Sequence, residues 1–331
     1  MPLAAFSETI RIATFAAPLS RDGPGLLLRD ILKGEDAQIA AAQDVIALID
    51  PDILVLTDFD YDLDGHAMQV FAALFGTRYA HQFAERPNTG MTTGLDLDQN
   101  GRTGEARDAQ GYGRFAGDGG MAILSSLPID TEQAINYSEI LWKDLPDRQL
   151  PQTDAGPFLP PDVLAIQRLS TAGHWIVPIQ PQRGPSFHLL VFSATPPVFD
   201  GPEDRNGLRN RDELRLWEHV LDGKLGPRPD SFVLTGNANL DPNDGAGLSA
   251  AMQAFLARPD VQDPLSGLPT ADWADDGPGD LRVSYVLPSA DWTVTDAGVF
   301  WPEPNTENAR LLGDDGLVAG VHHLVWVDIS R

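Results

Sequence analysis

The apolar residues of this chain fall into short runs whose spacing alternates between that of strands and that of helices. The β-branched, apolar run Thr9–Phe15 predicts a first strand, and Asp36–Ile49 carries apolar residues at helical spacing. Pro51 ends that helix, and the wholly apolar segment Ile53–Leu56 predicts a strand buried on both faces. A strand, a helix and a buried strand in succession are typical of an α/β fold.

The same alternation continues along the rest of the chain. Three further helices are predicted, at His66–Phe75, Arg205–Asp222 and Ser249–Leu256. Further strands are predicted at Met121–Leu124, Trp175–Ile179, Phe187–Phe192, Phe232–Leu234, Val283–Leu287, Trp292–Thr295 and Leu324–Ile329. The proline-rich segment Leu145–Pro161 is expected to be irregular. Because no repeat or low-complexity linker interrupts the pattern, we expect a single domain over residues 1–331.

One long segment lacks any regular pattern. Residues 88–120 are rich in Gly, Asp, Asn and Thr and poor in large apolar side chains. We therefore expect a long loop here, and loops of this length are usually functional or flexible.

The charge of the chain restricts its partners. Its 23 Lys and Arg residues against 48 Asp and Glu residues give a formal net charge of −25. Such a surface repels polyanions, and the sequence has no basic run that would bind phosphates, so free nucleic acid is not an expected partner. Solubility or a saline habitat also explains the acidity.

The absence of cysteine excludes disulfides, thiolate metal sites and a cysteine nucleophile. No apolar run approaches the roughly 18 residues that a membrane span needs, so no membrane partner is expected. The first residues lack the charged and apolar regions of a signal peptide. Two locations stay open: the cytoplasm, or the periplasm or cell exterior for a mature form.

Several stretches together resemble the endonuclease/exonuclease/phosphatase family. The resemblance spans nearly the whole chain, and its most specific stretch is TPPVFDGPEDRNG at Thr195–Gly207. The other stretches are Arg11–Phe15, Pro51–Asp62, Gly94–Gly104, Gly120–Ser125, Arg209–Trp217, Leu281–Ser289 and His322–Ile329. The resemblance implies a four-layer α/β sandwich, in which two packed mixed β-sheets are flanked by helices.

The resemblance also implies a set of polar groups at strand ends. Active members of the family hold a divalent cation with an Asn after the first strand and a Glu after the second. A His, a GDxN motif, the Asp of an RxDY strand and a closing SDH motif complete the site. Carboxylate and amide oxygens suit Mg²⁺ or Mn²⁺, which polarises the phosphoryl group while acid–base groups activate water.

This chain departs from the family at most of these positions. Asn239 and His322 keep the family's residue, and Asp58 replaces the Glu by a carboxylate one methylene shorter. Five positions have lost the chemical group: Ala16 stands for Asn, Ala194 for His, Asn237 for Asp, Ser284 for Asp and Val321 for Asp. Because the surrounding scaffold stretches still match, the losses are concentrated at the reactive groups.

Three functions are compatible with this pattern. The leading hypothesis is a non-catalytic or strongly impaired member of the family that binds an unidentified small ligand or protein partner, without Mg²⁺ or Mn²⁺ at the old site. The alternative is an active, divalent-metal-dependent phosphoesterase with a rearranged site built on Asp58, Asn239 and His322. The third is a stabilising partner of an active paralogue.

A second candidate site lies in the long loop. Asp96, Asp98 and Asn100, followed by Gly101, have the DxDxNG pattern that begins a calcium-binding loop. An EF-hand would place Glu at the twelfth position, where this chain has Arg107. Two interpretations stay open: Ca²⁺ bound in the 96–108 loop, or a turn stabilised by its own side chains.

Overall fold

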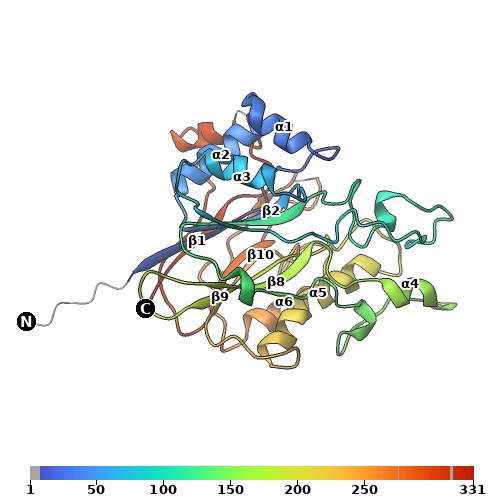
Figure 1. Ribbon diagram of the computed structural model, residues 1–331. Coiled ribbons are helices and arrows are strands. Elements are labelled where there is room, and N and C mark those ends of the chain that lie inside the picture. The colour runs from blue at the N-terminus through green and yellow to red at the C-terminus, as the bar shows by residue number, and fades with distance from the viewer. Residues whose placement is uncertain (1–7, 275, 314–315) are drawn as a thin grey trace, which may run out of the picture.

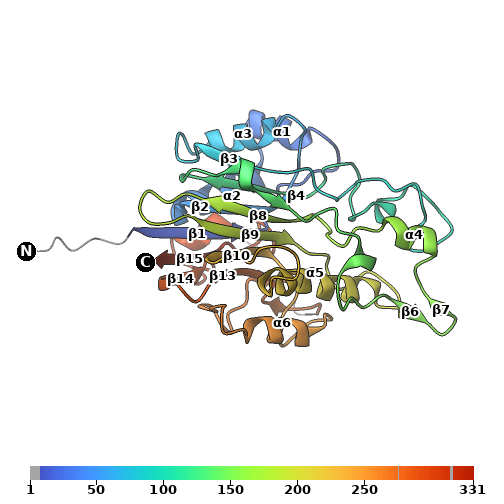
Figure 2. The same ribbon diagram turned by 60° about the horizontal axis from the view of Figure 1, so that its bottom comes forward.

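The computed structural model describes residues 8–274, 276–313 and 316–331. Two mixed β-sheets pack face to face at its centre, and helices cover the outer face of each sheet (Figures 1 and 2). The predicted four-layer sandwich is therefore confirmed. Helices α1, α2 and α3 lie on one outer face, and α5 and α6 lie on the other (Figure 1).

The first sheet has six strands. In spatial order they are β14 (Thr293–Val299), β15 (Val325–Ser330), β1 (Thr9–Phe15), β2 (Ile53–Phe59), β4 (Gly120–Ser125) and β3 (His81–Phe83). β1 and β2 run parallel, with Ile12 opposite Ile53, whereas the neighbours on either side of this pair run antiparallel to it.

The second sheet has five strands. Their order is β13 (Ser284–Pro288), β10 (Phe232–Asn237), β9 (Phe187–Ser193), β8 (Gly173–Ile179) and β5 (Ile135–Asn136). β9 and β10 run parallel, and their register places Asn237 opposite Ser193. Two short ribbons pair β11 (Ala271–Asp272) with β12 (Asp280–Leu281), and β6 (Gln152–Thr153) with β7 (Gly156–Pro157).

The helices connect and cover these strands. The α-helices are α1 (Leu26–Lys33), α2 (Ala37–Ile49), α3 (His66–Ala73), α4 (Pro161–Ile166), α5 (Arg205–Leu221) and α6 (Ser249–Leu256). The short 3-10 helices are η1 (Ala106–Asp108), η2 (Thr131–Gln133), η3 (Trp142–Asp144) and η4 (Asn308–Leu312). Asp36 begins α2 because its carboxylate accepts the Ile39 backbone N–H at 3.0 Å.

The pleat of the strands divides the core into layers. Along β2, Leu54 and Leu56 pack under the helices, whereas Ile53 and Val55 face the second sheet. All four side chains are fully buried, because this strand has protein on both sides. On the second sheet, Leu190 and Phe192 pack against α5, and their neighbours on the strand face the first sheet. Each central strand thus contributes to two cores.

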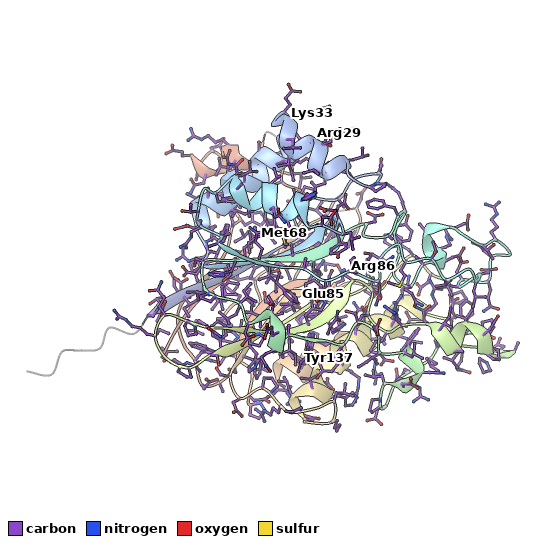
Figure 3. All side chains as sticks on the ribbon, viewed as in Figure 1. Arg29, Lys33, Met68, Glu85, Arg86 and Tyr137 are labelled. Carbon is purple, nitrogen blue, oxygen red and sulfur yellow. The ribbon has the colours of Figure 1, made fainter. Side chains whose placement is uncertain are left out.

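Outside the core, charged side chains cover the helices. Arg29 and Lys33 point away from α1 at the top of the molecule (Figure 3). In the part of the chain that the structure describes, no helix combines the length and the apolar character needed to cross a membrane.

Residues 88–119 form a long, mostly irregular loop, with η1 as its one helical turn among the described residues. It extends to one end of the sheets beside α4 (Figure 1). Asn88 is fully buried and anchors the loop, since its Nδ2 donates to the Ser138 and Ser170 carbonyls at 2.7 and 2.8 Å. Arg168 Nη1 donates to Asn88 Oδ1 at 2.8 Å.

The structure also contains elements that the pattern does not predict. Helix α1 buries only Leu27 and Ile31 and has no side-chain cap at its start, so neither periodicity nor a capping residue indicates it. The irregular segment Leu145–Pro161 includes the short ribbon of β6 and β7. Strand β2 continues beyond the predicted Leu56 to Phe59, through a bulge.

Candidate functional site

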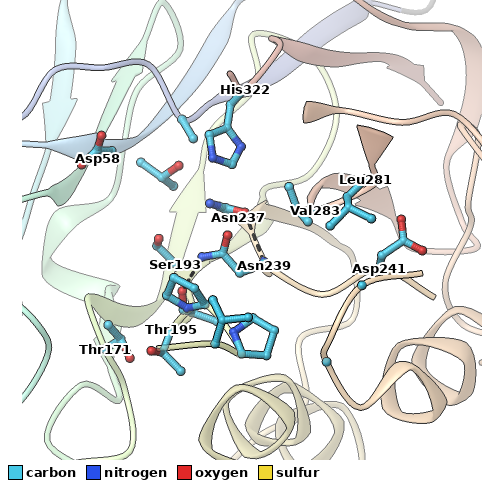
Figure 4. A pocket seen from close by; sticks show the side chains of 18 of the residues that line it. Asp58, Thr171, Ser193, Thr195, Asn237, Asn239, Asp241, Leu281, Val283 and His322 are labelled. Atoms are coloured by element: carbon cyan, nitrogen blue, oxygen red, sulfur yellow. Dashed lines mark hydrogen bonds between the residues drawn. The ribbon is translucent and has the colours of Figure 1, made fainter. Parts of the chain in front are cut away.

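A cleft of about 670 Å³ opens where strands of both sheets end (Figure 4). The parallel pairs β1/β2 and β9/β10 present their carboxyl ends to it, and the antiparallel strands β8, β13 and β15 begin there. Because each strand delivers the residues just beyond its end, side chains distant in the sequence meet in one cavity. Asp58, Ser193, Asn237 and His322 surround its floor (Figure 4).

Most of the residues singled out in the sequence meet in this cleft. Six of them line it: Ala16, Asp58, Ala194, Asn237, Asn239 and His322. Ser284 does not line the cleft; it pairs in register with Asn237 and is buried. Its Oγ makes no hydrogen bond in the part of the chain that the structure describes. Val321 also stays outside, and its carbonyl accepts the Asp272 N–H at 2.8 Å.

Asp58 sits on a bulge at the end of β2. Its φ of 70° is unusual for a residue with a side chain, and the pairing of β2 with β4 shifts register at this residue. The carboxyl group is reached by solvent through the open cleft, yet protein surrounds it on the other sides. This surrounding protein, followed by the carboxylates of Asp60 and Asp118, raises the pKa of Asp58 to about 7 against a hydrogen bond from Ser20.

Asp60, unlike Asp58, does not line the cleft, and its carboxylate holds two backbone segments together. It is buried, and its carboxylate accepts the Arg21 and Gly119 backbone N–H groups at 2.9 and 3.1 Å. Burial raises its pKa to about 7. Asp60 thus connects the loop after β1 to the end of the long loop.

The two asparagines support each other. Asn237 Oδ1 accepts the Asn239 backbone N–H at 3.1 Å, and Asn239 Nδ2 donates to the Ala194 carbonyl at 2.8 Å (Figure 4). Asn239 adopts φ 49°, a left-handed conformation that asparagine tolerates well. The preceding Gly236 is also required, because a Cβ there would collide with the Phe192 carbonyl of the parallel strand.

His322 enters the cleft from the segment before β15. Its imidazole packs edge-on against Trp273, with ring centroids 5.3 Å apart. Its Nδ1 is buried and has no hydrogen-bond partner among the described residues, so no carboxylate orients the ring. Burial, followed by the charge of His323, lowers the pKa of His322 to about 4, which keeps the ring neutral at pH 7.

A buried carboxylate positions two walls of the cleft. Glu213 on α5 is fully buried and accepts the backbone N–H groups of Thr171 and Thr195, which both line the cavity. Burial raises the pKa of Glu213 to about 7, although the buried guanidinium of Arg209 opposes this. Helix α5 therefore fixes the spacing between the loop before β8 and the loop after β9, which meet at the same edge of the sheet.

The cleft offers few ligands for a divalent cation. Ala16 provides no donor at the end of β1, and Asp58 is the single carboxylate at the end of β2 that faces the cavity. Hard cations such as Mg²⁺ need several oxygen ligands in near-octahedral geometry. The side chains at these two strand ends therefore do not fit the metal that the family implies.

The long loop gathers a different acidic group. Oxygen atoms of Asp96, Asp98 and Asp108 lie within 4.8 Å of one another, and no other such group of acidic or histidine side chains occurs in the described ranges. Asn100 lies beside it: its Nδ2 donates to Asp98 and Glu105, and its Oδ1 accepts the Arg102 N–H at 2.8 Å. Other residues of the loop already form hydrogen bonds or an ion pair with these three carboxylates.

Those contacts come from backbone amides and from one arginine. Asp96 accepts the Asn100 and Gly101 N–H groups, and Asp108 accepts the Leu97 and Glu105 N–H groups. Asp98 pairs with Arg107 at 3.1 Å.

Sequence reasoning does not identify the aromatic rim of the cleft. Tyr112, Phe199 and Trp273 line it from three loops far apart along the chain. Phe199 is 91% exposed and Tyr112 is 62% exposed. The one signal in the sequence is a phenylalanine placed between Val198 and Asp200 in a turn-rich segment.

Comparisons with known proteins agree with this architecture. The model of the Endonuclease/Exonuclease/phosphatase family matches residues 31–314. No curated protein matches the sequence.

Solved structures with the same fold share little sequence. An endonuclease/exonuclease/phosphatase from Beutenbergia cavernae is 15% identical, with a TM-score of 0.55 over 97% of this chain and 71% of that one. Sphingomyelinase C from Streptomyces griseocarneus is 16% identical, with a TM-score of 0.51 over 97% and 99%. A family protein from Bacteroides thetaiotaomicron is 10% identical, with a TM-score of 0.55 over 98% of each chain. At these identities the likeness shows the fold alone.

Proposed function

Because the chain belongs to the endonuclease/exonuclease/phosphatase family, we propose that it is a member that binds a ligand in the shared cleft without hydrolysing a phosphoester. The observation that carries this proposal is the chemistry of the cleft. Ala16 and Ala194 occupy positions where the resemblance implies a metal ligand and a catalytic histidine. Neither side chain can bind a cation or transfer a proton.

The state of His322 supports the same conclusion. A histidine that acts in catalysis is usually oriented by a hydrogen bond from its second nitrogen, commonly to a carboxylate. Here that nitrogen is buried without a partner in the described chain, and the neighbouring Val321 has no group to offer. Losing one general acid or base typically reduces a rate by about 10²–10⁴.

The test is a hydrolysis assay of the purified protein with Mg²⁺, Mn²⁺ and Ca²⁺ in turn. Substrates are a phosphomonoester, a phosphodiester, DNA and sphingomyelin, and the double variant Asp58→Ala/His322→Ala is the control. We expect wild type and control to give the same background rate with every metal. Metal-dependent turnover by wild type that the double variant lacks would instead establish the alternative, a phosphoesterase with a rearranged site.

One observation favours that alternative. The pKa of Asp58 lies near 7, where a carboxyl group can exchange a proton under physiological conditions, and Asp58, Asn239 and His322 line one cavity. The third hypothesis, a stabilising partner of an active paralogue, is separated from both by co-purification of a family member from the source cells.

We also propose that the 96–108 loop binds Ca²⁺ through Asp96, Asp98 and Asp108. Three carboxylates within 4.8 Å of one another support this, since their mutual repulsion is relieved by a cation. We expect CaCl₂ to raise the melting temperature relative to EDTA, by an amount equivalent to about 2.7 kcal/mol at a hundredfold excess over Kd.

The variant Asp96→Asn/Asp98→Asn is expected to abolish this calcium-dependent rise, whereas Asp154→Asn, an exposed acid elsewhere, is the matched control. If CaCl₂ raises the melting temperature equally in all three proteins, or does not raise it in wild type, the calcium proposal is contradicted and the loop is stabilised by its own contacts.

A further inference from the structure

Phe199 has two features that cost free energy. Its side chain is 91% exposed, and its backbone adopts φ 68°, a left-handed conformation that bulky residues rarely take. Exposing a large aromatic ring forgoes the stabilisation of burial, and backbone outliers of this kind are concentrated at ligand sites. A residue that combines both features therefore indicates a function outside the fold itself.

The surrounding contacts hold Phe199 in this position. Pro196 and Pro197 restrict the backbone that leads to it. The residues before and after Phe199 are both bound by Asn206. Its Nδ2 donates to the Val198 carbonyl at 2.7 Å, and its backbone N–H donates to the Asp200 carboxylate. The first turn of α5 thus fixes residues 196–200, which we call the ridge.

The ridge separates two cavities. The site cleft of about 670 Å³ lies on one side, and a second cavity of about 730 Å³ lies on the other. Phe199 and Tyr112 line both of them, and so do Thr195, Pro196 and Val198. Two exposed aromatic rings therefore stand where the cavities meet, within a groove that is longer than either cavity.

The lining of the site cleft is mainly apolar, and the polar side chains on its floor are mostly uncharged. Apart from the carboxyl group of Asp58, its hydrogen-bonding groups are hydroxyls, carboxamides and the neutral imidazole of His322. They come from Thr57, Thr89, Thr171, Ser193, Thr195, Asn237 and Asn239 besides His322. Thr57 and Thr89 are buried, and their hydroxyls make no hydrogen bond to any described residue.

The charges of the groove exclude anions. The lining of the site cleft contains Asp58, Asp241 and Asp244 and no Lys or Arg. In the second cavity the arginines are already engaged: Arg205 donates to the Leu97 carbonyl, Arg209 to several loop carbonyls, and Arg107 pairs with Asp98. With a net charge of −25 on the whole chain, a phosphorylated ligand would be repelled.

We propose that this groove binds an uncharged saccharide, with Phe199 and Tyr112 stacked on the apolar faces of its sugar rings. This inference rests on the proposed function, because it names the ligand class of the non-hydrolytic cleft. A sugar ring combines an apolar face, which packs on an aromatic ring, with hydroxyl groups at its edge. The neutral hydroxyls and amides of the floor match those edges, and an acyl chain would leave them unpaired.

The test is binding of the labelled protein to an array of neutral glycans, followed by calorimetry with cellotetraose, maltotetraose and chitotetraose. Inorganic phosphate and tetramethylammonium are measured in parallel as an anion and a cation. We expect at least one neutral glycan to bind and Phe199→Ala to weaken it by about tenfold or more. Phe199→Trp keeps the stacking surface and is expected to retain affinity.

Leu63→Ala is the matched control, because Leu63 is 83% exposed and lines neither cavity. It should bind as wild type does, and all variants should keep the wild-type melting temperature within a few degrees, since neither side chain is buried. The proposal is overturned if no neutral glycan binds, if phosphate or tetramethylammonium binds instead, or if Phe199→Ala binds a glycan as tightly as wild type. None of these results bears on hydrolysis, which the metal-dependent assay judges separately.

Discussion

Beside the cleft, buried neighbours determine both the tautomer and the pKa of a single side chain, that of His174. It is fully buried between the rings of Phe192 and Trp217. Its Nε2 lies 2.9 Å from the Glu213 carbonyl, which can only accept, so Nε2 carries the proton and Nδ1 accepts from the Ser170 hydroxyl. Burial lowers the pKa of His174 to about 3.

This lowered pKa predicts a pH dependence of stability. Below pH 6.5 the unfolded chain takes up a proton at His174, whereas the folded protein does not until about pH 3, so stability falls as the pH falls through this range. The lowered pKa of His174 reduces the free energy of unfolding by about 1.4 kcal/mol for each pH unit of this fall. His174→Gln keeps a hydrogen-bond donor but cannot titrate. The difference in unfolding free energy between wild type and this variant should therefore shrink by about 2 kcal/mol between pH 6.5 and pH 5.

Urea unfolding at the two pH values measures that difference, and the exposed His66→Gln is the matched control. A deficit that is the same at both pH values would mean that His174 titrates in the folded protein near its ordinary pKa.

The elements around the site are held by a small number of buried polar contacts. The long loop depends on Asn88, whose side chain makes three hydrogen bonds to the segment 138–170. Its own glycines allow close backbone approach: a Cβ at Gly90 would collide with the Phe115 carbonyl. The loop is therefore a packed wall of the cleft, although it contains little regular secondary structure.

We predict that Asn88→Ala loosens this wall. It removes the Asn88 donor from the Ser138 carbonyl, leaves the Ser170 carbonyl with Arg209 Nη2 as its donor, and takes the acceptor from Arg168 Nη1. We expect these losses to cost about 2–4 kcal/mol of unfolding free energy. Limited proteolysis should cut within residues 88–119 faster than in wild type, and urea unfolding gives the free energy. Asn243→Ala, at an exposed position, is the control. Equal cleavage rates in all three proteins would contradict the role assigned to Asn88.

Which elements the sequence predicts depends on where their side chains are buried. The central strands are buried on both faces, so continuous apolar runs such as Ile53–Leu56 indicate them directly. Helix α1 has the run Leu26–Leu28, but Leu32 is 67% exposed, so no clear apolar face identifies it. The short strands β3 and β5 are supported by their neighbours rather than by their own sequence.

At the scale of the whole molecule, the four-layer fold follows from the family resemblance and from the alternation of strands and helices, and both predictions are confirmed. The strand-end positions meet in one cleft because the parallel strands end together. The aromatic rim is different, since Tyr112, Phe199 and Trp273 belong to loops whose approach is set by tertiary contacts such as those of Glu213 and Asn206. No local pattern in the sequence encodes those contacts.

The strand directions also give the molecule two unlike poles. β1 starts and β15 ends at the pole opposite the long loop, so Arg331 lies far from the cleft mouth (Figure 1). A protein attached to a bead or a sensor chip through this C-terminal residue would have its cleft on the side away from the support, facing the solution. Attachment at one pole therefore leaves the cleft at the other pole open to solution.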